Sequence, residues 1–449
     1  MERLFGTNGV RGIINKDMNV QLAMDLGRSI GTFMKGKVAV GTDSRTSAAM
    51  IKSAVSSGLM CAGAEVLDLG LVPTPVVQHY VKTNHLSGGI MITASHNPPE
   101  FNGIKCVDAD GTEMPRNKEE EIERLFFTKS FVSKDWKDVG QLRQATGAVQ
   151  AYLGSVTGLV NADAIRGAGL TVVLDCANGA GAVTAPQLLE DLNVRAITLN
   201  CNPQGTFPGH PSEPVESHLK DLIALVKDTG ADLGIAHDGD ADRTIFIDDK
   251  GRYMYGDKSL AITAEAMVRE NRGGIVVTPV SSSMAVEDVV RRAGGEVIYT
   301  RVGAPVVARK MIEVGAVFGG EENGGLIFPK HQYCRDGAMT VAKMLEIVAR
   351  NGPLSSLVDG IPMYSQDKRK MVCPDERKEK VLTALVDYYA SQRVDTTDGV
   401  KICYDDGWTL VRPSGTEPLF RVYSEARTPE DAKRRSEECE NVLRKLVEG

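Results

Sequence analysis

The stretch KVAVGTDSRTSAAMIKSAVSSGLMCAGAEVLDLG, residues 37–70, decides the fold, because it predicts an apolar strand, a helix and a second strand. A further helix and strand follow it along the chain. The predicted strands are 37–43, 65–70 and 88–95, and the predicted helices are 44–63 and 74–82. Strands that alternate with helices are typical of a βαβαβ series, in which the strands run parallel and the crossovers are right-handed.

The same pattern begins again twice further along the chain. Apolar strands ending in a small polar turn lead into a helix at LTVVLDCANGAG (170–181) and at GIVVTPVSSS (274–283). The first of these series continues with strands at 194–200 and 231–240 and a helix at 215–229, and the second with strands at 295–303 and 316–325. We therefore expect three related α/β units of roughly 100 residues each, with mixed, largely parallel sheets.

The last part of the chain has a different pattern. A lysine-rich helix at 377–391 precedes three short strands and a charged helix at 429–447, which predicts a C-terminal α+β domain. A loop at 360–366 separates this domain from the preceding unit. The predicted domains are 1–150, 151–252, 253–365 and 366–449.

Length, composition and charge exclude several classes of protein. The chain has 449 residues, 42% apolar and 25% charged, values typical of a globular protein rather than a disordered one. The net charge is −7 and no long basic block occurs, so we expect neither nucleic acid nor a membrane as partner. No apolar signal core or membrane-length apolar run occurs, which favours a cytoplasmic protein. The eight cysteines form no C-x-x-C pair, so we expect reduced thiols.

The segment TASHNPPEFNGIK (93–105) follows an apolar strand and places Ser95 at the carboxyl edge of a sheet, where open α/β folds bind ligands. Its two prolines prevent a regular helix and stiffen the loop. Ser95 has His96 beside it and Lys105 nearby, so it could be a nucleophile. A Ser/Asn/Pro turn without chemistry is the alternative.

The segment HDGDADR (237–243) ends another predicted strand and alternates Asp238, Asp240 and Asp242. Three carboxylates this close repel one another unless a cation lies among them, and oxygen ligands suit Mg²⁺ or Mn²⁺. An EF-hand is disfavoured because its sixth and twelfth positions hold Arg243 and Asp249. Two alternatives stay open: a structural acidic turn, and a haloacid-dehalogenase-like phosphatase with Asp240 as nucleophile. The phosphatase fold needs a helical crossover, whereas TIFIDDKG continues as a strand and turn.

Three further segments carry groups suited to sugar phosphates. RPSGTEPLFR (412–421) combines two arginines with the small loop of Ser414, Gly415 and Thr416, which suits a phosphate dianion. GGEENGG (319–325) offers carboxylates and an amide suited to sugar hydroxyls. FGTNGVRGI (5–13) is a Gly-rich loop that carries Arg11. Taken alone, each of the three could be an ordinary polar loop.

These five segments, in this order, resemble the α-D-phosphohexomutase family of phosphoglucomutases, phosphomannomutases and phosphoglucosamine mutases. The resemblance runs from FGTNGVRG to RPSGTEP, over essentially the whole chain. It implies four domains around a central cleft. It also implies a reaction that interconverts hexose 6-phosphate and hexose 1-phosphate through a phosphoserine enzyme and a hexose 1,6-bisphosphate, which would serve as intermediate and activator.

The resemblance implies roles for individual residues. Ser95 would carry the phosphate, and one Mg²⁺ would be held by phospho-Ser95, Asp238, Asp240 and Asp242. The groups around the transferred phosphate would be Arg11, His96, Lys105 and Arg243. Glu321 and Asn323 would face the sugar hydroxyls. The other phosphate would be held by Arg412, Ser414, Gly415, Thr416 and Arg421.

One position departs from the family pattern, and it bears on the acid/base chemistry. Many relatives end the 319–325 loop with a histidine, where this chain has Asn323 and Gly325, so Lys105 is the remaining acid/base candidate. We expect hexose phosphates as the partners, glucosamine phosphate as the leading substrate, and mannose or glucose phosphates as the alternatives. A sugar-phosphate hydrolase with an Asp nucleophile is the alternative from another class. Whether the chain forms a homo-oligomer stays open.

Overall fold

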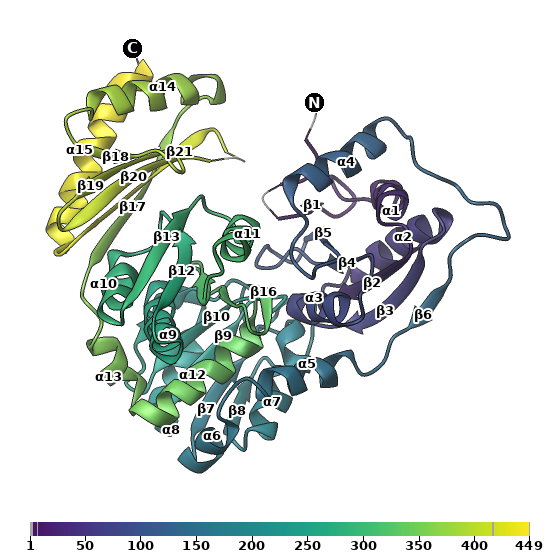
Figure 1. Ribbon diagram of the computed structural model, residues 1–449, viewed down its shortest axis with the longest axis horizontal. Helices are drawn as coiled ribbons and strands as arrows, with labels where there is room; N and C mark the ends of the chain where they lie inside the picture. The colour runs from purple at the N-terminus through teal and green to yellow at the C-terminus, as the bar shows by residue number, and fades with distance from the viewer. Residues whose placement is uncertain (1–2, 7, 415–416, 449) are drawn as a thin grey trace.

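The computed structural model describes residues 3–6, 8–414 and 417–448, which form four sheets flanked by helices (Figure 1). The first three sheets are mixed and the fourth is antiparallel, which confirms the predicted fold class. Over these residues, no helix combines the length and the apolar character needed to cross a membrane.

The first sheet has the strand order β1-β5-β4-β2-β3-β6. Its strands are β1 (Val10–Ile13), β2 (Lys37–Thr42), β3 (Glu65–Leu71), β4 (Gly88–Ile92), β5 (Phe101–Val107) and β6 (Leu142–Gln144). Its helices are α1 (Val20–Met34), α2 (Ala48–Cys61), α3 (Thr74–Thr83) and α4 (Arg116–Phe127). Strands β2, β3 and β4 run parallel, as predicted. The helix expected from residue 44 begins at Ala48, because the preceding residues turn around the Asp43 carboxylate, which accepts from the Arg45 N–H.

The second sheet has the order β11-β10-β9-β7-β8, and the third has the order β13-β12-β14-β15-β16. The second contains β7 (Thr171–Asp175), β8 (Arg195–Leu199), β9 (Leu233–His237), β10 (Thr244–Asp248) and β11 (Tyr253–Met254). The third contains β12 (Gly274–Pro279), β13 (Gly295–Thr300), β14 (Phe318–Gly320), β15 (Leu326–Phe328) and β16 (Gln332–Arg335). The helices of this region are α5 (Ala148–Thr157), α6 (Ala162–Ala168), α7 (Ala185–Asp191), α8 (Lys220–Thr229), α9 (Gly256–Glu270), α10 (Met284–Arg292), α11 (Ala304–Val314), α12 (Gly337–Asn351) and α13 (Leu354–Asp359). The helix predicted over 215–229 is a short 3₁₀ turn followed by α8.

The first three sheets repeat one topology, which confirms that the units are related. In each sheet, one central strand (β2, β7 or β12) pairs in parallel with the two strands that follow it in the sequence. The second of those two strands (β4, β9 or β14) is joined by a hairpin loop to an antiparallel strand. The turning loops are β4–β5, β9–β10 and β14–β15. These loops carry the TASHNP, DGDADR and GEENGG segments, so three motifs far apart in sequence occupy the same place in three repeats.

The fourth sheet is fully antiparallel, with the order β17-β21-β20-β19-β18. It contains β17 (Ser365–Val372), β18 (Arg393–Asp395), β19 (Val400–Tyr404), β20 (Gly407–Pro413) and β21 (Leu419–Ala426), with α14 (Asp375–Tyr388) and α15 (Pro429–Glu448). The three predicted strands and the final helix are confirmed. The sequence analysis missed β17, which pairs with β21 along its whole length. Its sequence, SQDKRKMV, is too polar to show the apolar alternation expected of a strand.

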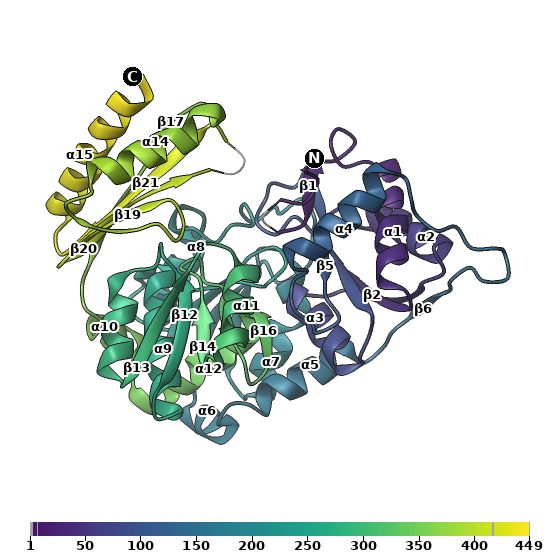
Figure 2. The same ribbon diagram turned by 45° about the horizontal axis from the view of Figure 1, so that its top comes forward.

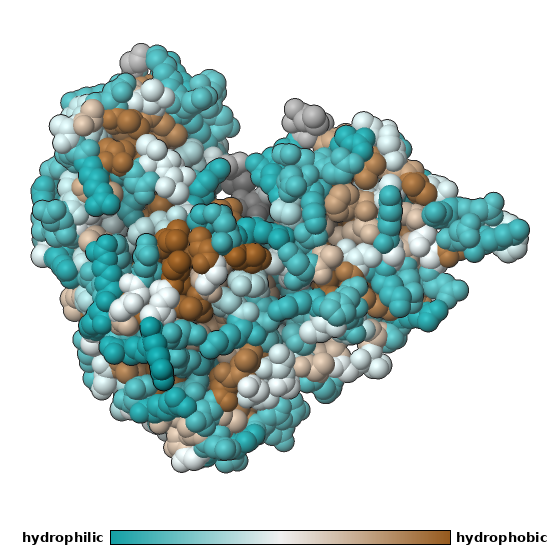
Figure 3. Space-filling model, in the orientation of Figure 1, coloured by the Kyte–Doolittle hydropathy of each residue, from teal (hydrophilic) through white to brown (hydrophobic). Residues whose placement is uncertain are grey.

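The cores explain how the four units are joined. One buried apolar cluster runs through the first three units, from Ala39 to Ile361, whereas the fourth unit has its own core around Val381 and Phe420. Among the described residues, the apolar cluster that links the fourth unit to the third is small and includes Val280 and Trp408. Hydrogen bonds also join the two units, among them that of the Met284 N–H to Glu425 and that of Lys401 Nζ to the Val280 carbonyl. In Figures 1 and 2 the fourth unit lies apart from the first, and Figure 3 shows a notch between them. The domain limits predicted from the sequence stay a prediction.

Candidate active site

Ser95 lies at the start of the β4–β5 loop and meets the second unit directly. Its side chain is buried, and its Oγ donates a hydrogen bond to Asp238 Oδ2 at 2.8 Å. The backbone loops also touch, because a Cβ on Gly239 would lie 2.6 Å from the Ser95 carbonyl oxygen. A side chain at position 239 would therefore push the two loops apart, so glycine there permits the contact.

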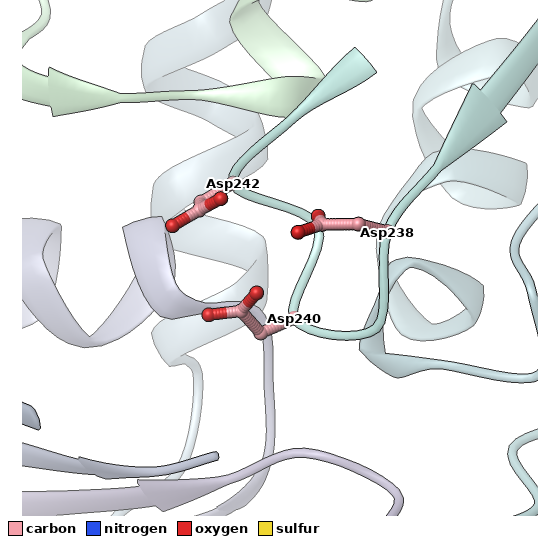
Figure 4. A group of neighbouring side chains, drawn as sticks. All are labelled: Asp238, Asp240 and Asp242. Atoms are coloured by element: carbon pink, nitrogen blue, oxygen red, sulfur yellow. The ribbon is translucent and has the colours of Figure 1, made fainter. Parts of the chain in front are cut away.

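Asp238, Asp240 and Asp242 project to one side of the β9–β10 loop (Figure 4), and one ligand oxygen from each lies within 4.8 Å of the others. All three side chains are buried. The Oδ1 atoms of Asp240 and Asp242 have no hydrogen-bond partner among the described residues. Burial and the two neighbouring carboxylates raise the pKa of Asp238 to about 8. The cluster thus has orphaned oxygens and excess negative charge, and both are features that a divalent cation would satisfy.

Two buried cations already neutralise part of this cluster. Lys105 Nζ, on β5, lies 2.6 Å from Asp240 Oδ2 and 3.2 Å from Asp242 Oδ2, and Arg335 Nη2 lies 2.6 Å from Asp242 Oδ2. Burial opposes ionisation of Asp240 and Asp242, but these ion pairs outweigh it and hold both pKa values below the usual range. Burial likewise disfavours charged Lys105, but the two carboxylates outweigh it and raise the pKa of that amine.

The other residues predicted around the transferred phosphate lie close to this cluster. Arg11 donates to Asn97 Oδ1 at 2.8 Å and to the Ala94 carbonyl at 3.3 Å. Arg243 Nε lies 3.9 Å from oxygens of Asp238 and Asp242. Burial, followed by the charges of Arg243 and Arg11, lowers the pKa of His96 to about 3, so its imidazole is neutral near pH 7. Arg11 and Arg243 therefore add positive charge beside the acidic cluster, whereas His96 adds a neutral imidazole.

Glu321 and Asn323 lie on the β14–β15 loop, and Arg335 links them to the acidic cluster. Glu321 Oε1 accepts from the Gly303 N–H at 3.1 Å, and Glu321 Oε2 lies 3.4 Å from Arg335 Nη1 and 3.5 Å from Asn323 Nδ2. A Cβ on Gly325 would lie 2.2 Å from Arg335 Cδ. The Arg335 side chain therefore fills the space that a histidine at position 325 would need.

Arg335 was not predicted from the sequence, although its side chain is buried in the site. It ends β16, only two strands after the loop it contacts, and α12 begins two residues later. In the sequence, the one feature that marks it is the pair Arg335-Asp336, which stands between the end of a strand and the start of a helix. That signal is weak, because such a pair is also common at exposed helix starts.

The predicted phosphate loop lies in the fourth unit. Arg412 and Arg421 are directly opposite on β20 and β21, so their side chains share one face of the sheet. Arg412 Nε lies 2.6 Å from Asp398 Oδ2, and Arg421 Nη2 lies 3.6 Å from Glu417 Oε2. Ser414 donates its N–H to the Leu419 carbonyl. Gly415 and Thr416 lie outside the described residues. Within the described part of the chain, no hydrogen bond or ion pair joins Arg412 or Arg421 to Ser95 or the three aspartates.

Comparison with known proteins accounts for all four units. Four family models match, described as phosphoglucomutase/phosphomannomutase alpha/beta/alpha domain I over residues 2–133, domain II over 150–251, domain III over 255–364 and the C-terminal domain over 370–442. Their order along the chain is the order of the four sheets.

Relatives along the full length give the same result. The chain is 43% identical to a phosphoglucomutase/phosphomannomutase of Thermococcus kodakarensis, over the whole of both chains. It is 41% identical to a probable phosphoglucosamine mutase of Methanopyrus kandleri, over all of this chain and 99% of that one. A crystal structure of a phosphoglucomutase/phosphomannomutase family protein from Burkholderia thailandensis, 27% identical, covers 99% of this chain and 98% of its own, with a TM-score of 0.89. The hydrolase alternative is not favoured, and the chain belongs to the phosphoglucomutase/phosphomannomutase family of phosphohexomutases.

Proposed function

We propose that the protein interconverts hexose 6-phosphates and hexose 1-phosphates, with Ser95 as the phosphoryl carrier. The observation that carries the proposal is the contact between two units: Ser95 Oγ, from the first, lies 2.8 Å from Asp238 Oδ2, from the second. A serine alone is a weak nucleophile, but this one lies in a buried site with three carboxylates and four cationic side chains. Such a site suits phosphoryl transfer, which depends mainly on positioning and on neutralised charge.

The acidic cluster fits a divalent cation, and we propose one Mg²⁺ per chain. Its donors are all oxygens, and two of them are orphaned within the described residues. Asp238, Asp240 and Asp242 would hold the ion together with an oxygen of phospho-Ser95. When bound, the ion would neutralise charge on the phosphoryl oxygens.

In the proposed reaction, the Oγ–P bond of phospho-Ser95 breaks as a hydroxyl oxygen of the sugar phosphate forms a new bond to phosphorus. The proton of that hydroxyl is transferred, in net terms, to Ser95 Oγ. The hexose 1,6-bisphosphate then turns around, and its other phosphate returns to Ser95. Arg11 and Arg243 balance the charge of the phosphoryl group. Lys105, which is kept protonated by its ion pairs with Asp240 and Asp242, would give a proton to the departing oxygen and regain the one that the hydroxyl releases. The small apolar contact between the third and fourth units suits a domain that opens for this turn.

We propose glucosamine phosphate as the leading substrate, and we expect mannose and glucose phosphates to react as well. Glu321 and Asn323 suit hydroxyls that the three sugars share. The negative charge of Glu322 and the three aspartates gives only a mild preference for the cationic amine of glucosamine phosphate. The names of the two relatives, which cover glucose, mannose and glucosamine phosphates, support this range.

The test is an isomerisation assay with the 6-phosphates of glucosamine, mannose and glucose under equal Ser95 phosphorylation. We expect kcat/KM values within ~10³ of one another, because Glu321 and Asn323 suit hydroxyls that the three sugars share. Turnover of a single sugar, with the other two silent, would contradict the proposed breadth. Loss of phosphate to water without any isomerisation would contradict the mutase itself.

We expect Arg412→Ala to weaken substrate binding more than turnover. The proposed role of Arg412 is to hold the phosphate that does not react, so its loss should raise KM by ~10–100-fold, which corresponds to ~1.5–3 kcal/mol. The measurement is steady-state kinetics with glucosamine 6-phosphate. Arg393→Ala is the matched control, because Arg393 is an exposed arginine on β18 of the same sheet. A KM for Arg412→Ala within about twofold of that control would remove this loop from the site.

A further inference from the structure

A buried ion pair lies beneath the Ser95 loop and has no part in the chemistry described so far. Arg45 Nε lies 3.1 Å from Asp43 Oδ2, and neither side chain is exposed to solvent. Asp43 follows the end of β2, and its backbone N–H donates to the Ile92 carbonyl at the end of β4. The pair is therefore anchored to the two parallel strands at whose carboxyl edge Ser95 lies.

The Arg45 guanidinium donates to four backbone carbonyls of the 95–101 loop. Its Nη2 donates to Ser95 O at 2.8 Å and to Asn97 O at 2.6 Å. Its Nη1 donates to Pro98 O at 2.6 Å and to Phe101 O at 2.9 Å. A loop with two prolines lacks two N–H donors of its own, so Arg45 supplies the shortest bonds to these buried and partly buried carbonyls. Pro98 O also accepts from the Phe101 N–H, and Ser212 Oγ lies 3.4 Å from both Ser95 O and Asn97 O. Among side chains, only the planar guanidinium of arginine has enough N–H donors to bond all four carbonyls.

Thr93 connects the same ion pair to the other side of Ser95. The Ser95 N–H donates to Thr93 Oγ1 at 2.8 Å, and the Thr93 hydroxyl donates to Asp43 Oδ2 at 2.6 Å. The N–H and the C=O of Ser95 are thus both held, directly or through Thr93, by Asp43 and Arg45. Ser95 has a φ of +51°, a left-handed conformation that non-glycine residues rarely adopt.

The second unit covers this arrangement. The Phe207 ring centroid lies 5.1 Å from Arg45 Cζ, and a Cβ on Gly205 would lie 2.4 Å from the Ser44 carbonyl oxygen. Water is therefore kept from the guanidinium, which strengthens its bonds to the carbonyls.

We propose that Arg45, Asp43 and Thr93 are positioning residues that hold Ser95 in its left-handed conformation and so direct Oγ toward the acidic cluster. The inference rests on the proposed role of Ser95 as phosphoryl carrier. Without these bonds the Ser95 backbone would relax toward the extended region, and Oγ would leave the position 2.8 Å from Asp238. Substrate binding in the fourth unit would be unaffected, so phosphoryl transfer should slow while KM stays unchanged.

The decisive variant is Thr93→Val, which keeps the side-chain shape and removes the hydroxyl. We expect kcat to fall ~10–100-fold with KM within about twofold, because a misplacement of about 1 Å can cost that much. Thr93→Ser restores the hydroxyl and should recover activity to within about threefold. Arg45→Lys keeps the positive charge but loses the planar guanidinium, and it should lower kcat to a similar extent. The matched controls lie in the fourth unit: Thr409→Val, at a buried threonine, and Arg435→Lys, at a partly buried arginine that bonds the Glu425 carbonyl.

The second readout is the rate at which glucose 1,6-bisphosphate phosphorylates Ser95, followed by intact mass and corrected for the folded fraction. We expect slow phosphorylation of Thr93→Val and Arg45→Lys, and wild-type rates for Thr93→Ser and both controls. Equal rates in wild type and Thr93→Val would overturn the inference, as would a loss that Thr93→Ser fails to restore. A wild-type protein that takes up no phosphate would instead overturn the proposed function, so the two failures are distinguishable.

Discussion

Ser95→Ala should fold normally and lose turnover by a factor on the order of 10⁶, as a variant that lacks its nucleophilic serine does in another enzyme. The change removes the oxygen that carries the phosphate, and a bound water cannot replace a fixed phosphoryl donor. The fold should tolerate it, because only one hydrogen bond, to Asp238, is lost, at a cost of about 1 kcal/mol. The measurements are steady-state isomerisation and the melting temperature.

The matched control is Ser29→Ala, at a buried serine of α1 whose hydroxyl bonds the Asp25 carbonyl far from the site. It should keep wild-type activity. Phosphopeptide mapping adds an independent readout, because phosphoserine survives hydroxylamine whereas an acyl phosphate on aspartate does not. Unchanged activity in Ser95→Ala, or a label found only on Asp240, would contradict the role proposed for Ser95.

Removal of divalent cations should abolish activity, and Mg²⁺ should restore it. Without the ion, three buried carboxylates face a phosphate dianion, and their mutual repulsion is only partly offset by Lys105 and Arg335. We expect a fall on the order of 10³-fold, equivalent to several kcal/mol of lost charge stabilisation. The assay is isomerisation in excess chelator, followed by titration with Mg²⁺.

Binding itself can be measured with Mn²⁺ by electron paramagnetic resonance, independently of activity. We expect one site in the wild type and a greatly weakened one in Asp240→Asn, with a loss of metal affinity larger than the loss of stability that follows from the broken Lys105–Asp240 ion pair. Asp163→Asn is the control, because the Asp163 side chain is 96% exposed and lies far from the cluster. Full activity in excess chelator would contradict the metal site, and so would equal Mn²⁺ affinity in Asp240→Asn and Asp163→Asn.

The fold could be predicted where local patterns are strong. Alternating apolar strands and helices determined the three related units, because burial of β2, β7 and β12 on both faces requires near-continuous apolar runs. Strand β17 escaped prediction for the opposite reason. It is the edge strand of a sheet, and its charged side chains meet water, so its pairing with β21 is set by the partner strand and not by its own composition.

The residue types of the site could be predicted as well. The motif around Ser95, the alternating aspartates and Lys105 were all predicted to act together, and the structure joins them by direct bonds. Their roles stay proposals, whereas their proximity is now a fact of geometry. It arises because each of the three repeats places the same hairpin loop at the same edge of its sheet.

Only the tertiary structure decided which charged residues stabilise the site from within. By itself, the sequence determined the family and the three related units, and it predicted the groups that we propose to bind phosphate, because short motifs of fixed spacing encode them. It did not reveal Arg45 beneath the Ser95 loop, or Arg335 in the space beside Gly325. The sequence alone does not distinguish a solvent-exposed arginine from one whose guanidinium donates to four buried or partly buried carbonyls. Burial makes the difference, because a guanidinium removed from water must find its partners in the protein, and those partners come from distant segments of the chain.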